Sequence, residues 1–279
     1  MKLLKLLFIL LMGVSLSVAT SCSKDDDNDD DNTGGDNPPA SSKCYIKKST
    51  NDDGSYSVFE YNSDNKVIKA TDYDDKGNED GVTLISYNSD GMMSMFVSVE
   101  NGDTSMKIEV TYSGNKPSVA NLHINMGTGL KLFSKFVYTF NNDELTKMVT
   151  QADPVGTGFM DVAKKEYTYS GKNVVMIKES QFDATSGTMK LKSTTEYTFD
   201  DKKNSYVGIG VDYLMGEPQF ISVNNPLKVT YKDDKGVVDN DESYNYTYEY
   251  NSNDYPTKIT AKNFSGSKTE VTTNEYNCK

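Results

Sequence analysis

The sequence predicts an all-β protein: an antiparallel up-and-down meander of about 16 strands that forms a closed or nearly closed, flattened barrel. Three observations carry this prediction. A short aromatic-and-turn motif recurs along the chain, and helical periodicity is missing from every long segment, although Val211 to Gly216 could make one turn. Two cysteines also stand at the two ends of the repeated region.

The first element, residues 1–21, has the features of an export signal. Lys2 and Lys5 supply a positive start, and the run from Leu6 to Val18 supplies an apolar core. That core is shorter than the roughly 20 apolar residues that a membrane-spanning helix needs. Ala19 to Ser21 then offer small residues that suit a signal peptidase, so we expect a cleaved signal rather than a transmembrane helix.

Cys22 directly follows these small residues, and the segment resembles a bacterial lipobox, although Ala19 stands where that motif usually has leucine. The resemblance implies cleavage before Cys22 and acylation of its thiol and new amine. Each buried methylene of an acyl chain contributes about 0.8 kcal/mol, so several chains hold a protein on a membrane without a spanning segment. An ordinary signal peptide with an incidental cysteine is the alternative.

Residues 22–43 form the second element, an acidic tether that we expect to be disordered because its like charges repel. Six aspartates lie between Asp25 and Asp31. The stretch CSKDDD resembles the acidic export tag of surface-exposed lipoproteins in Bacteroidota, which implies a place on the outer face of the outer membrane. A purely solvating spacer is the alternative interpretation.

Residues 44–279 read as one domain, because no break in composition divides them. The chain carries a formal net charge of -12, and all of its 29 basic residues are lysines. Nucleic acid is therefore an unlikely class of partner, since phosphate binding needs a basic surface. Bidentate recognition of phosphate or carboxylate by arginine is excluded as well.

Cys44 and Cys278 remain after Cys22 is set aside, and in an oxidising compartment we expect them to form a disulfide. Two unpaired thiols are the alternative. In an antiparallel meander the start of the first strand and the end of the last lie at the same end only when the number of strands is even. The pairing therefore favours 16 strands over 17, with residues 205–226 the hardest part to assign.

The repeated motif is an apolar or aromatic residue, any residue, an aromatic residue and a polar turn. Alternation is explicit before one of these turns, where Met106, Ile108, Val110 and Tyr112 share one face of a strand. The eight copies are FEYNSDN at Phe59, ISYNSDG at Ile85, VTYSGNK at Val110, YTFNNDE at Tyr138, YTYSGKN at Tyr167, YTFDDKK at Tyr197, VTYKDDKG at Val229 and YEYNSND at Tyr248. Each copy predicts a hairpin.

These repeats, behind a lipoprotein signal, resemble a family of uncharacterised Bacteroidota surface lipoproteins with a porin-like β-barrel fold. They are more weakly similar to tyrosine-aspartate repeats, whose Gly-Arg-Leu step is missing here. The resemblance implies the barrel but no catalytic residues. Sixteen strands enclose a lumen too wide for side chains alone to fill, so we expect the two walls to pack on one another. The absence of tryptophan argues against a membrane-crossing barrel.

The chain has 19 tyrosines, and these are the best candidates for side chains that contact a ligand. Tyr244, Tyr246, Tyr248 and Tyr250 fall on one face of one expected strand, and an exposed row of aromatic rings can stack on sugars. Most tyrosines, however, sit at the repeat position, where ladders of aromatic side chains join neighbouring hairpins. Both interpretations remain open for this row.

Candidates for metal binding and catalysis are weaker. The acidic segment from Asp72 to Asp80 offers closely spaced oxygens, but Lys76 stands where a calcium loop needs Asp or Asn. The single histidine, His123, has no adjacent nucleophile motif. We therefore expect no metal, no cofactor and no catalytic residue.

The sequence thus predicts a non-enzymatic outer-membrane lipoprotein, exposed at the cell surface, that binds an extracellular glycan or protein. A structural or adhesive surface protein is one alternative. A hydrolase that uses paired carboxylates is another, because 41 acidic residues give many chance pairs in space.

Overall fold

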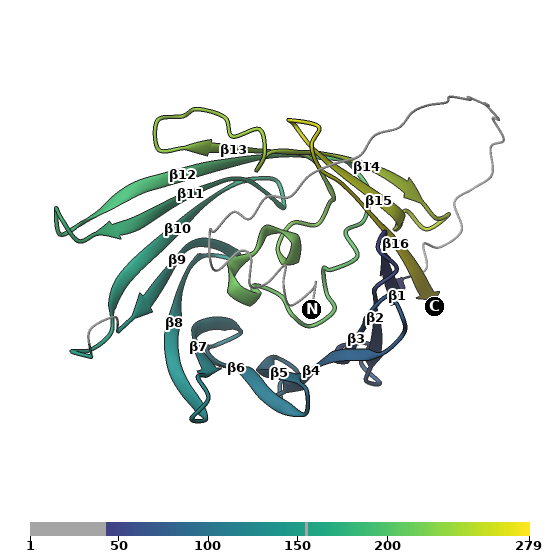
Figure 1. The fold of residues 1–279 in the computed structure, drawn as a ribbon, viewed down its shortest axis with the longest axis horizontal. Helices are drawn as coiled ribbons and strands as arrows, with labels where there is room; N and C mark the ends of the chain where they lie inside the picture. The colour runs from purple at the N-terminus through teal and green to yellow at the C-terminus, as the bar shows by residue number, and fades with distance from the viewer. Residues whose placement is uncertain (1–42, 154–155) are drawn as a thin grey trace.

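The structure is a computed structural model that describes residues 43–153 and 156–279, and Figure 1 shows its ring of strands. The expected export signal, Cys22 and the tether up to residue 42 lie outside the described residues. The strands are β1 (Cys44–Asn51), β2 (Tyr56–Tyr61), β3 (Val67–Tyr73), β4 (Glu79–Tyr87), β5 (Met93–Glu100), β6 (Asp103–Ser113), β7 (Lys116–Asn125), β8 (Leu130–Asn141), β9 (Glu144–Ala152), β10 (Met160–Ser170), β11 (Asn173–Asp183), β12 (Thr188–Phe199), β13 (Pro226–Asp233), β14 (Tyr244–Tyr250), β15 (Pro256–Asn263) and β16 (Thr269–Cys278).

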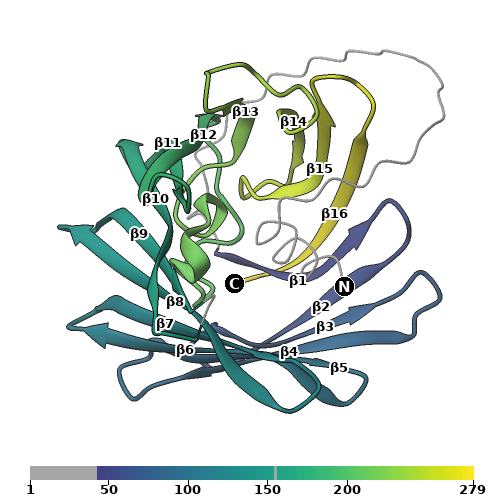
Figure 2. The same ribbon diagram turned by 60° about the vertical axis from the view of Figure 1, so that its left-hand side comes forward.

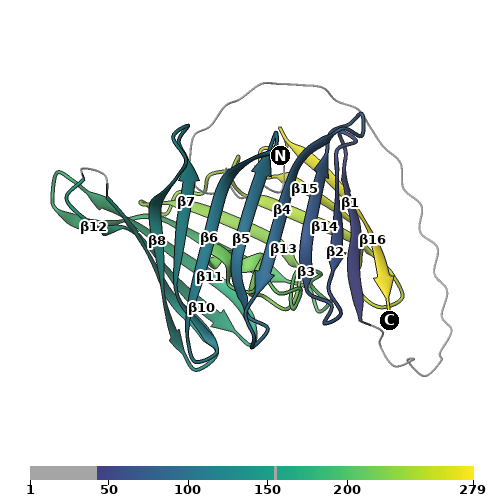
Figure 3. The same cartoon turned by 90° about the horizontal axis from the view of Figure 1, so that it is seen from below.

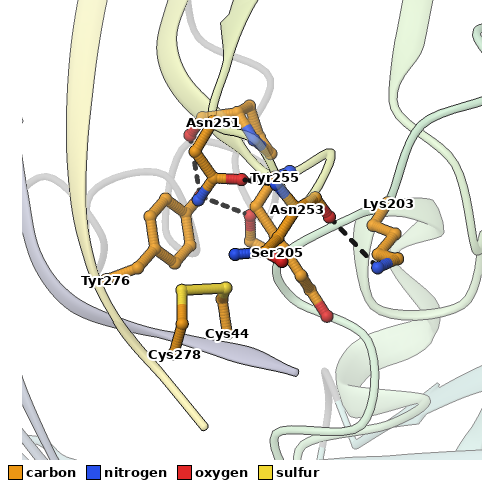
Figure 4. Close-up of a disulfide and its surroundings, with 9 residues drawn as sticks. Cys44, Lys203, Ser205, Asn251, Asn253, Tyr255, Tyr276 and Cys278 are labelled. Atoms are coloured by element: carbon orange, nitrogen blue, oxygen red, sulfur yellow. Dashed lines mark hydrogen bonds between the residues drawn. A yellow bond between two sulfur atoms is a disulfide. The ribbon is translucent and has the colours of Figure 1, made fainter. Parts of the chain in front are cut away.

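Each strand pairs with the next in an antiparallel manner, and β1 pairs with β16 to close the barrel. The predicted meander of 16 strands and its closure are confirmed. Cys44 lies opposite Cys278 in the closing pair, and the two are joined by the expected disulfide, which Figure 4 shows beside Tyr276. We call this end of the barrel the disulfide end and the opposite end the far end. Figure 3 shows the inclined strands running between the two ends.

One connection at the disulfide end differs from all the others. Six of the hairpins close there with turns of two to five residues, whereas β12 and β13 are joined by residues 200–225. This internal segment lies inside the ring of strands, as Figures 1 and 2 show in green. It contains two short 3-10 helices, η1 (Leu214–Gly216) and η2 (Pro218–Phe220). η1 confirms the single helical turn expected between Val211 and Gly216.

The internal segment forms the centre of the hydrophobic core. Its apolar side chains Ile209, Val211, Leu214, Met215 and Phe220 are buried together with residues that the strands point inward. Those strand residues include Ile46, Phe59, Val67, Ile85, Phe96, Met106, Ile108, Leu122, Phe136, Leu145, Val174 and Ile177. The walls were expected to pack on one another, but they pack instead on this segment, whose five large apolar side chains supply the volume that a wide lumen requires.

Gly216 shows how closely the internal segment fits against the wall. Its backbone adopts a φ of +67°, in the left-handed region. A Cβ at this position would meet the Tyr167 hydroxyl, and would lie 2.9 Å from the Met148 sulfur. The Tyr167 hydroxyl instead donates to the Gly216 carbonyl at 2.9 Å. Only glycine satisfies both the conformation and the space.

The repeated motif on seven even-numbered strands lies opposite a β-bulge, because the extra residue belongs to the following odd-numbered strand, as Ile68 does on β3 and Ser94 does on β5. The register shifts directly before the third motif residue on β2, β4, β6, β8, β10, β12 and β14. A bulge bends the strand and increases its twist, so seven of them curve the sheet toward closure. The copy at Val229 lies on β13, runs toward the far end and precedes the predicted hairpin to β14, but its strand pairing shows no such register shift. The last even strand, β16, instead carries Tyr276.

Tyrosine hydroxyls near the ends of six even-numbered strands each bond back to the preceding odd-numbered strand. Each donor lies near the end of an even strand, and each acceptor is a carbonyl near the start of the preceding odd strand. The bonds are Tyr61 to Ile46 (2.8 Å), Tyr87 to Val67 (2.6 Å), Tyr112 to Met93 (2.8 Å), Tyr169 to Leu145 (3.1 Å), Tyr248 to Pro226 (2.6 Å) and Tyr276 to Pro256 (2.7 Å). On β8 and β12 the third motif residue is phenylalanine, which has no hydroxyl. The repeat tyrosines thus act as clasps between neighbouring strands.

Replacing one clasp by phenylalanine tests this role. Tyr112→Phe keeps the ring and removes only the donor to Met93, so we expect the free energy of unfolding to fall by about 1 kcal/mol. Tyr246→Phe is the matched control, because within the described residues the Tyr246 hydroxyl has no hydrogen-bond partner. Urea unfolding of both variants gives the comparison. Equal midpoints for the two would show that the clasps contribute nothing.

The outer wall of the barrel carries many charged pairs between neighbouring strands. Lys258 and Glu249 are 2.7 Å apart, Lys232 and Glu196 are also 2.7 Å apart, and Lys69 lies 3.1 Å from a carboxylate on β2. Such solvent-exposed pairs contribute little to the free energy of folding, but they make much of the outer wall polar. Within the described residues, no helix has the length and apolar character needed to cross a membrane.

Candidate functional site

The predicted tyrosine row on β14 faces the lumen. Tyr244, Tyr246, Tyr248 and Tyr250 are each half-buried, whereas Asn245, Thr247 and Glu249 between them are exposed on the outer wall. Of the two interpretations left open for this row, the inward direction agrees with a ladder of packed rings rather than with an exposed platform. Alternation placed the row correctly on one face, but sequence alone could not say which face looks inward.

The rings of this row pack on one another. Neighbouring centroids lie 6.4 Å apart between Tyr246 and Tyr248 and 5.7 Å apart between Tyr248 and Tyr250, with interplanar angles of 15° and 29°. Tyr248 donates to the Pro226 carbonyl, and Tyr250 donates to the Asp200 carboxylate at the base of the internal segment. Burial raises the pKa of Tyr246, so its phenol stays protonated. The ring faces are thus largely occupied by other rings, and a ligand role for the row stays a prediction.

A buried ion pair fixes the internal segment to the barrel wall. The Lys165 ammonium on β10 lies 2.7 Å from the Glu217 carboxylate, between η1 and η2, and both side chains are largely buried. Burial by itself lowers the pKa of Lys165, but the charge and hydrogen bond of Glu217 outweigh it, so the pKa lies above its usual value. Lys165 therefore stays charged at neutral pH. No motif in the sequence signals that these two residues meet.

A polar hollow opens at the far end of the barrel, between the β1–β2 and β3–β4 loops. Its volume is about 300 Å³. It is lined by side chains that carry oxygen, nitrogen or an aromatic ring, namely Asn51, Asp53, Ser55, Tyr56, Ser57, Asp72, Tyr73, Asp74, Asp75 and Asp80. The acidic segment singled out in the sequence forms one side of this hollow, while the β1–β2 loop, which sequence reasoning missed, forms the other.

Two tyrosines provide the aromatic part of the hollow. Tyr56 and Tyr73 pair across β2 and β3, and their rings stack with centroids 4.7 Å apart and planes 17° apart. The Lys48 ammonium lies 4.0 Å from the centroid of the Tyr56 ring. This contact and the stacking hold Tyr56 in place, which leaves a rigid aromatic wall beside the carboxylates.

Some carboxylates of the hollow have structural partners already. Ser57 donates to the buried Asp72, and Asp74 accepts from the backbone and side chain of Asn78 at 2.8 Å each. The hydrogen bonds from Asn78 lower the pKa of Asp74. Within the described ranges, no three histidine, cysteine, aspartate or glutamate side chains are arranged to hold a metal ion. The hollow is thus a set of hydrogen-bond acceptors of fixed geometry.

His123 lies away from this hollow. It is on β7 opposite Lys107, on the outer face of the wall, and its Nδ1 atom is 3.7 Å from the Glu109 carboxylate. Cys44 and Cys278 are joined in the disulfide and supply no thiolate. The geometry around the histidine therefore offers no nucleophile with a base beside it.

Comparison with solved structures identifies relatives of the fold. The barrel resembles porin-like proteins of Bacteroides. The protein from Bacteroides vulgatus aligns with a TM-score of 0.54 at 14% identity, over 84% of this chain and 99% of that one. The protein from Bacteroides uniformis aligns with a TM-score of 0.51 at 12% identity, over 84% of this chain and 96% of that one. No protein-family profile and no curated protein matches the sequence.

At these identities the likeness to the porin-like proteins establishes the fold and nothing further. It agrees with the porin-like barrel that the sequence repeats implied. In this chain the lumen holds the internal segment, and the far-end hollow combines aromatic rings with several hydrogen-bond acceptors.

Proposed function

We propose that this protein is a non-enzymatic outer-membrane lipoprotein, exposed at the cell surface, that binds an extracellular glycan in the far-end hollow. The observation that carries the proposal is the hollow itself, with stacked Tyr56 and Tyr73 beside five aspartates and Asn51. Sugar hydroxyls donate hydrogen bonds to carboxylate and amide oxygens, and the apolar faces of sugar rings pack on aromatic side chains.

The charge of the hollow restricts the class of ligand that it can bind. Its lining contains carboxylates but no lysine, and the chain has no arginine. The Lys48 ammonium on the Tyr56 ring is outnumbered by the five carboxylates, so an anionic ligand would meet net repulsion and a neutral polyhydroxylated ligand is favoured. A basic protein segment is the competing ligand that the same charge would accept.

Anchoring by acylated Cys22 agrees with where the chain enters the barrel. Lys43, the first described residue, lies at the disulfide end, where its backbone N–H donates to the Lys279 carbonyl at 3.1 Å. The hollow lies at the other end, beyond the length of a strand. A lipid anchor before residue 43 therefore leaves the hollow clear of the point of attachment.

A glycan panel tests the binding site. We expect wild-type protein to be retained on at least one glycan, and Tyr73→Ala and Asp75→Asn to weaken that retention by at least about tenfold, the effect of losing roughly 1.4 kcal/mol of contact free energy. Tyr246→Ala, in the lumenal row, is the comparison and should keep full retention. Circular dichroism checks that each variant is folded.

Three outcomes of the panel would contradict the proposed site. Loss of retention with Tyr246→Ala alone would move the site to the lumenal tyrosine row. Retention that survives Tyr73→Ala and Asp75→Asn would exclude the hollow. No retention on any glycan would exclude the ligand class. Anchoring is tested separately by labelled palmitate, which should be incorporated into the wild type and lost with Cys22→Ser.

A further inference from the structure

Aliphatic side chains cover part of the outer wall over β2 to β5. We call the following seven residues the apolar strip: Val58, Ile68, Val82, Leu84, Met95, Val97 and Val99. Leu84 stands between Thr83 and Ile85, which both line an apolar cavity against the internal segment, so its own side chain points outward. Leu84 is 42% exposed and Ile68 is 37% exposed, and the other five are half-buried.

The strand register makes this strip continuous. Val58, Val82 and Val99 lie in one row across β2 to β5, joined through Thr71 on β3. Leu84 and Val97 lie side by side in the next row. Side chains at adjacent register positions are about 5 Å apart, so the aliphatic side chains form one surface rather than isolated exposed residues.

The outer face of β14 to β16 has a different character. Its outward residues are mostly polar or charged, with Val271 as an aliphatic exception: Asn245, Thr247, Glu249, Lys258, Thr260, Lys262, Thr269, Thr273 and Glu275. The barrel therefore has one wall suited to water and another with an aliphatic surface. This asymmetry does not follow from folding, because both walls bury their inward faces against the lumen in the same way.

Lysines lie on both sides of the strip. Lys69 is the neighbour of Leu84 on β3, and Lys107 is the neighbour of Val97 on β6. Their ammonium groups are held 3.1 Å from Glu60 and 3.0 Å from Glu109. Lysine stems can cover aliphatic surface and extend their ammonium groups to the polar side of a lipid interface, although Glu109 stands opposite Met95 of the strip.

The chain before the barrel favours lipid as the partner of this strip. Cys22 is separated from Lys43 by 20 residues, which span at most about 75 Å even when fully extended. β1, which that chain enters, is adjacent to β2, where the strip begins. An acyl anchor would therefore keep the strip at high local concentration near a lipid surface, and a weak contact then suffices.

We propose that the barrel lies with the apolar strip of β2 to β5 against the lipid surface to which it is anchored. This inference rests on the proposed anchoring at Cys22. It assigns to the outer wall a second role, that of orienting the barrel on the membrane.

The absence of tryptophan from the chain provides a clean test. The chain from Cys22 onward is coupled through the Cys22 thiol to a maleimide lipid in vesicles, since the other two cysteines form the disulfide. Leu84→Trp reports on the strip, and Thr247→Trp reports on the polar wall. We expect brominated lipid to quench Leu84→Trp at least about twofold and to leave Thr247→Trp unchanged.

Adding Val97→Lys to the Leu84→Trp variant should abolish the quenching, while circular dichroism stays the same. Quenching of both reporters alike, or of neither, would overturn the proposal. A dimer of the uncoupled chain in sedimentation, dissociated by Val97→Lys, would show that a second copy covers the strip and would also overturn it. Because the coupling is chemical, these results do not depend on palmitate incorporation, which tests the anchor alone.

Discussion

Replacing Glu217 by alanine should lower the free energy of unfolding by about 3 to 5 kcal/mol. The substitution leaves the Lys165 ammonium buried in the wall of the lumen without the carboxylate that now lies 2.7 Å away. A buried charge that loses its partner costs far more than the pair itself contributes. Urea unfolding at neutral pH, followed by circular dichroism, measures the change.

Two controls separate this effect from a general loss of charge. Glu249→Ala removes a partner of Lys258 on the outer wall, where the two side chains are 66% and 43% exposed, and should change stability by less than about 1 kcal/mol. Lys165→Met combined with Glu217→Ala removes both charges and should recover most of the loss. If Glu217→Ala behaves like Glu249→Ala, the internal segment does not dock on β10 as described.

The pH dependence of the ion pair has a definite sign. The pKa of Lys165 is raised above its ordinary value of 10.5, so its contribution is fully present below that pH and is lost as the pH rises through the folded-state pKa. Stability between pH 6 and 9 should therefore show no loss from this pair.

Removing the disulfide should have the second large effect. The bond closes a sequence separation of 234 residues, and Cys44→Ser with Cys278→Ser should lower the free energy of unfolding by about 2 to 5 kcal/mol. The chain-entropy argument behind this range is that the bond removes conformations from the unfolded chain. Guanidinium unfolding of the variant and the wild type gives the difference.

The disulfide variant should also open locally before it unfolds. Among the described strands, β1 and β16 alone are paired without being consecutive in the chain, so hydrogen exchange should rise first in 44–51 and 269–278. The β6–β7 pair, joined by a tight turn, is the internal reference. Equal exchange in both pairs together with an unchanged midpoint would mean that the closing pair does not need the disulfide.

Local patterns in the sequence were sufficient to predict the barrel. Alternation in runs such as Met106 to Tyr112 gives the strands, and the recurring turn residues give the hairpins. The two cysteines then supply the long-range condition, an even strand number with adjacent ends. Each of these signals acts over neighbouring residues or through one covalent bond, which is why one sequence can show them.

The contents of the lumen could not be predicted in the same way. The internal segment has no period, and its apolar residues from Ile209 to Phe220 look like those of any irregular connection. Its position depends on contacts such as Lys165 with Glu217 that join residues 52 apart in the sequence. For the same reason the inward direction of the Tyr244 to Tyr250 row could not be predicted.

The far-end hollow was not predicted from the sequence. The acidic segment from Asp72 to Asp80 was visible, but the pairing of β2 with β3 is what brings Tyr56 onto Tyr73. The apolar strip was hidden altogether, because an aliphatic residue next to a buried one in a strand gives no sign of which face looks outward. The register across four strands determines which aliphatic side chains share the outer face.

Closure of the barrel can be tested by one peptide map. Digestion at lysine without reduction should release residues 44–47 linked to residues 269–279, because Cys44 and Cys278 lie opposite one another in the closing pair. The account predicts this single linked species in the folded, exported protein. Recovery of the two peptides as separate free thiols would show that the two ends of the barrel do not meet.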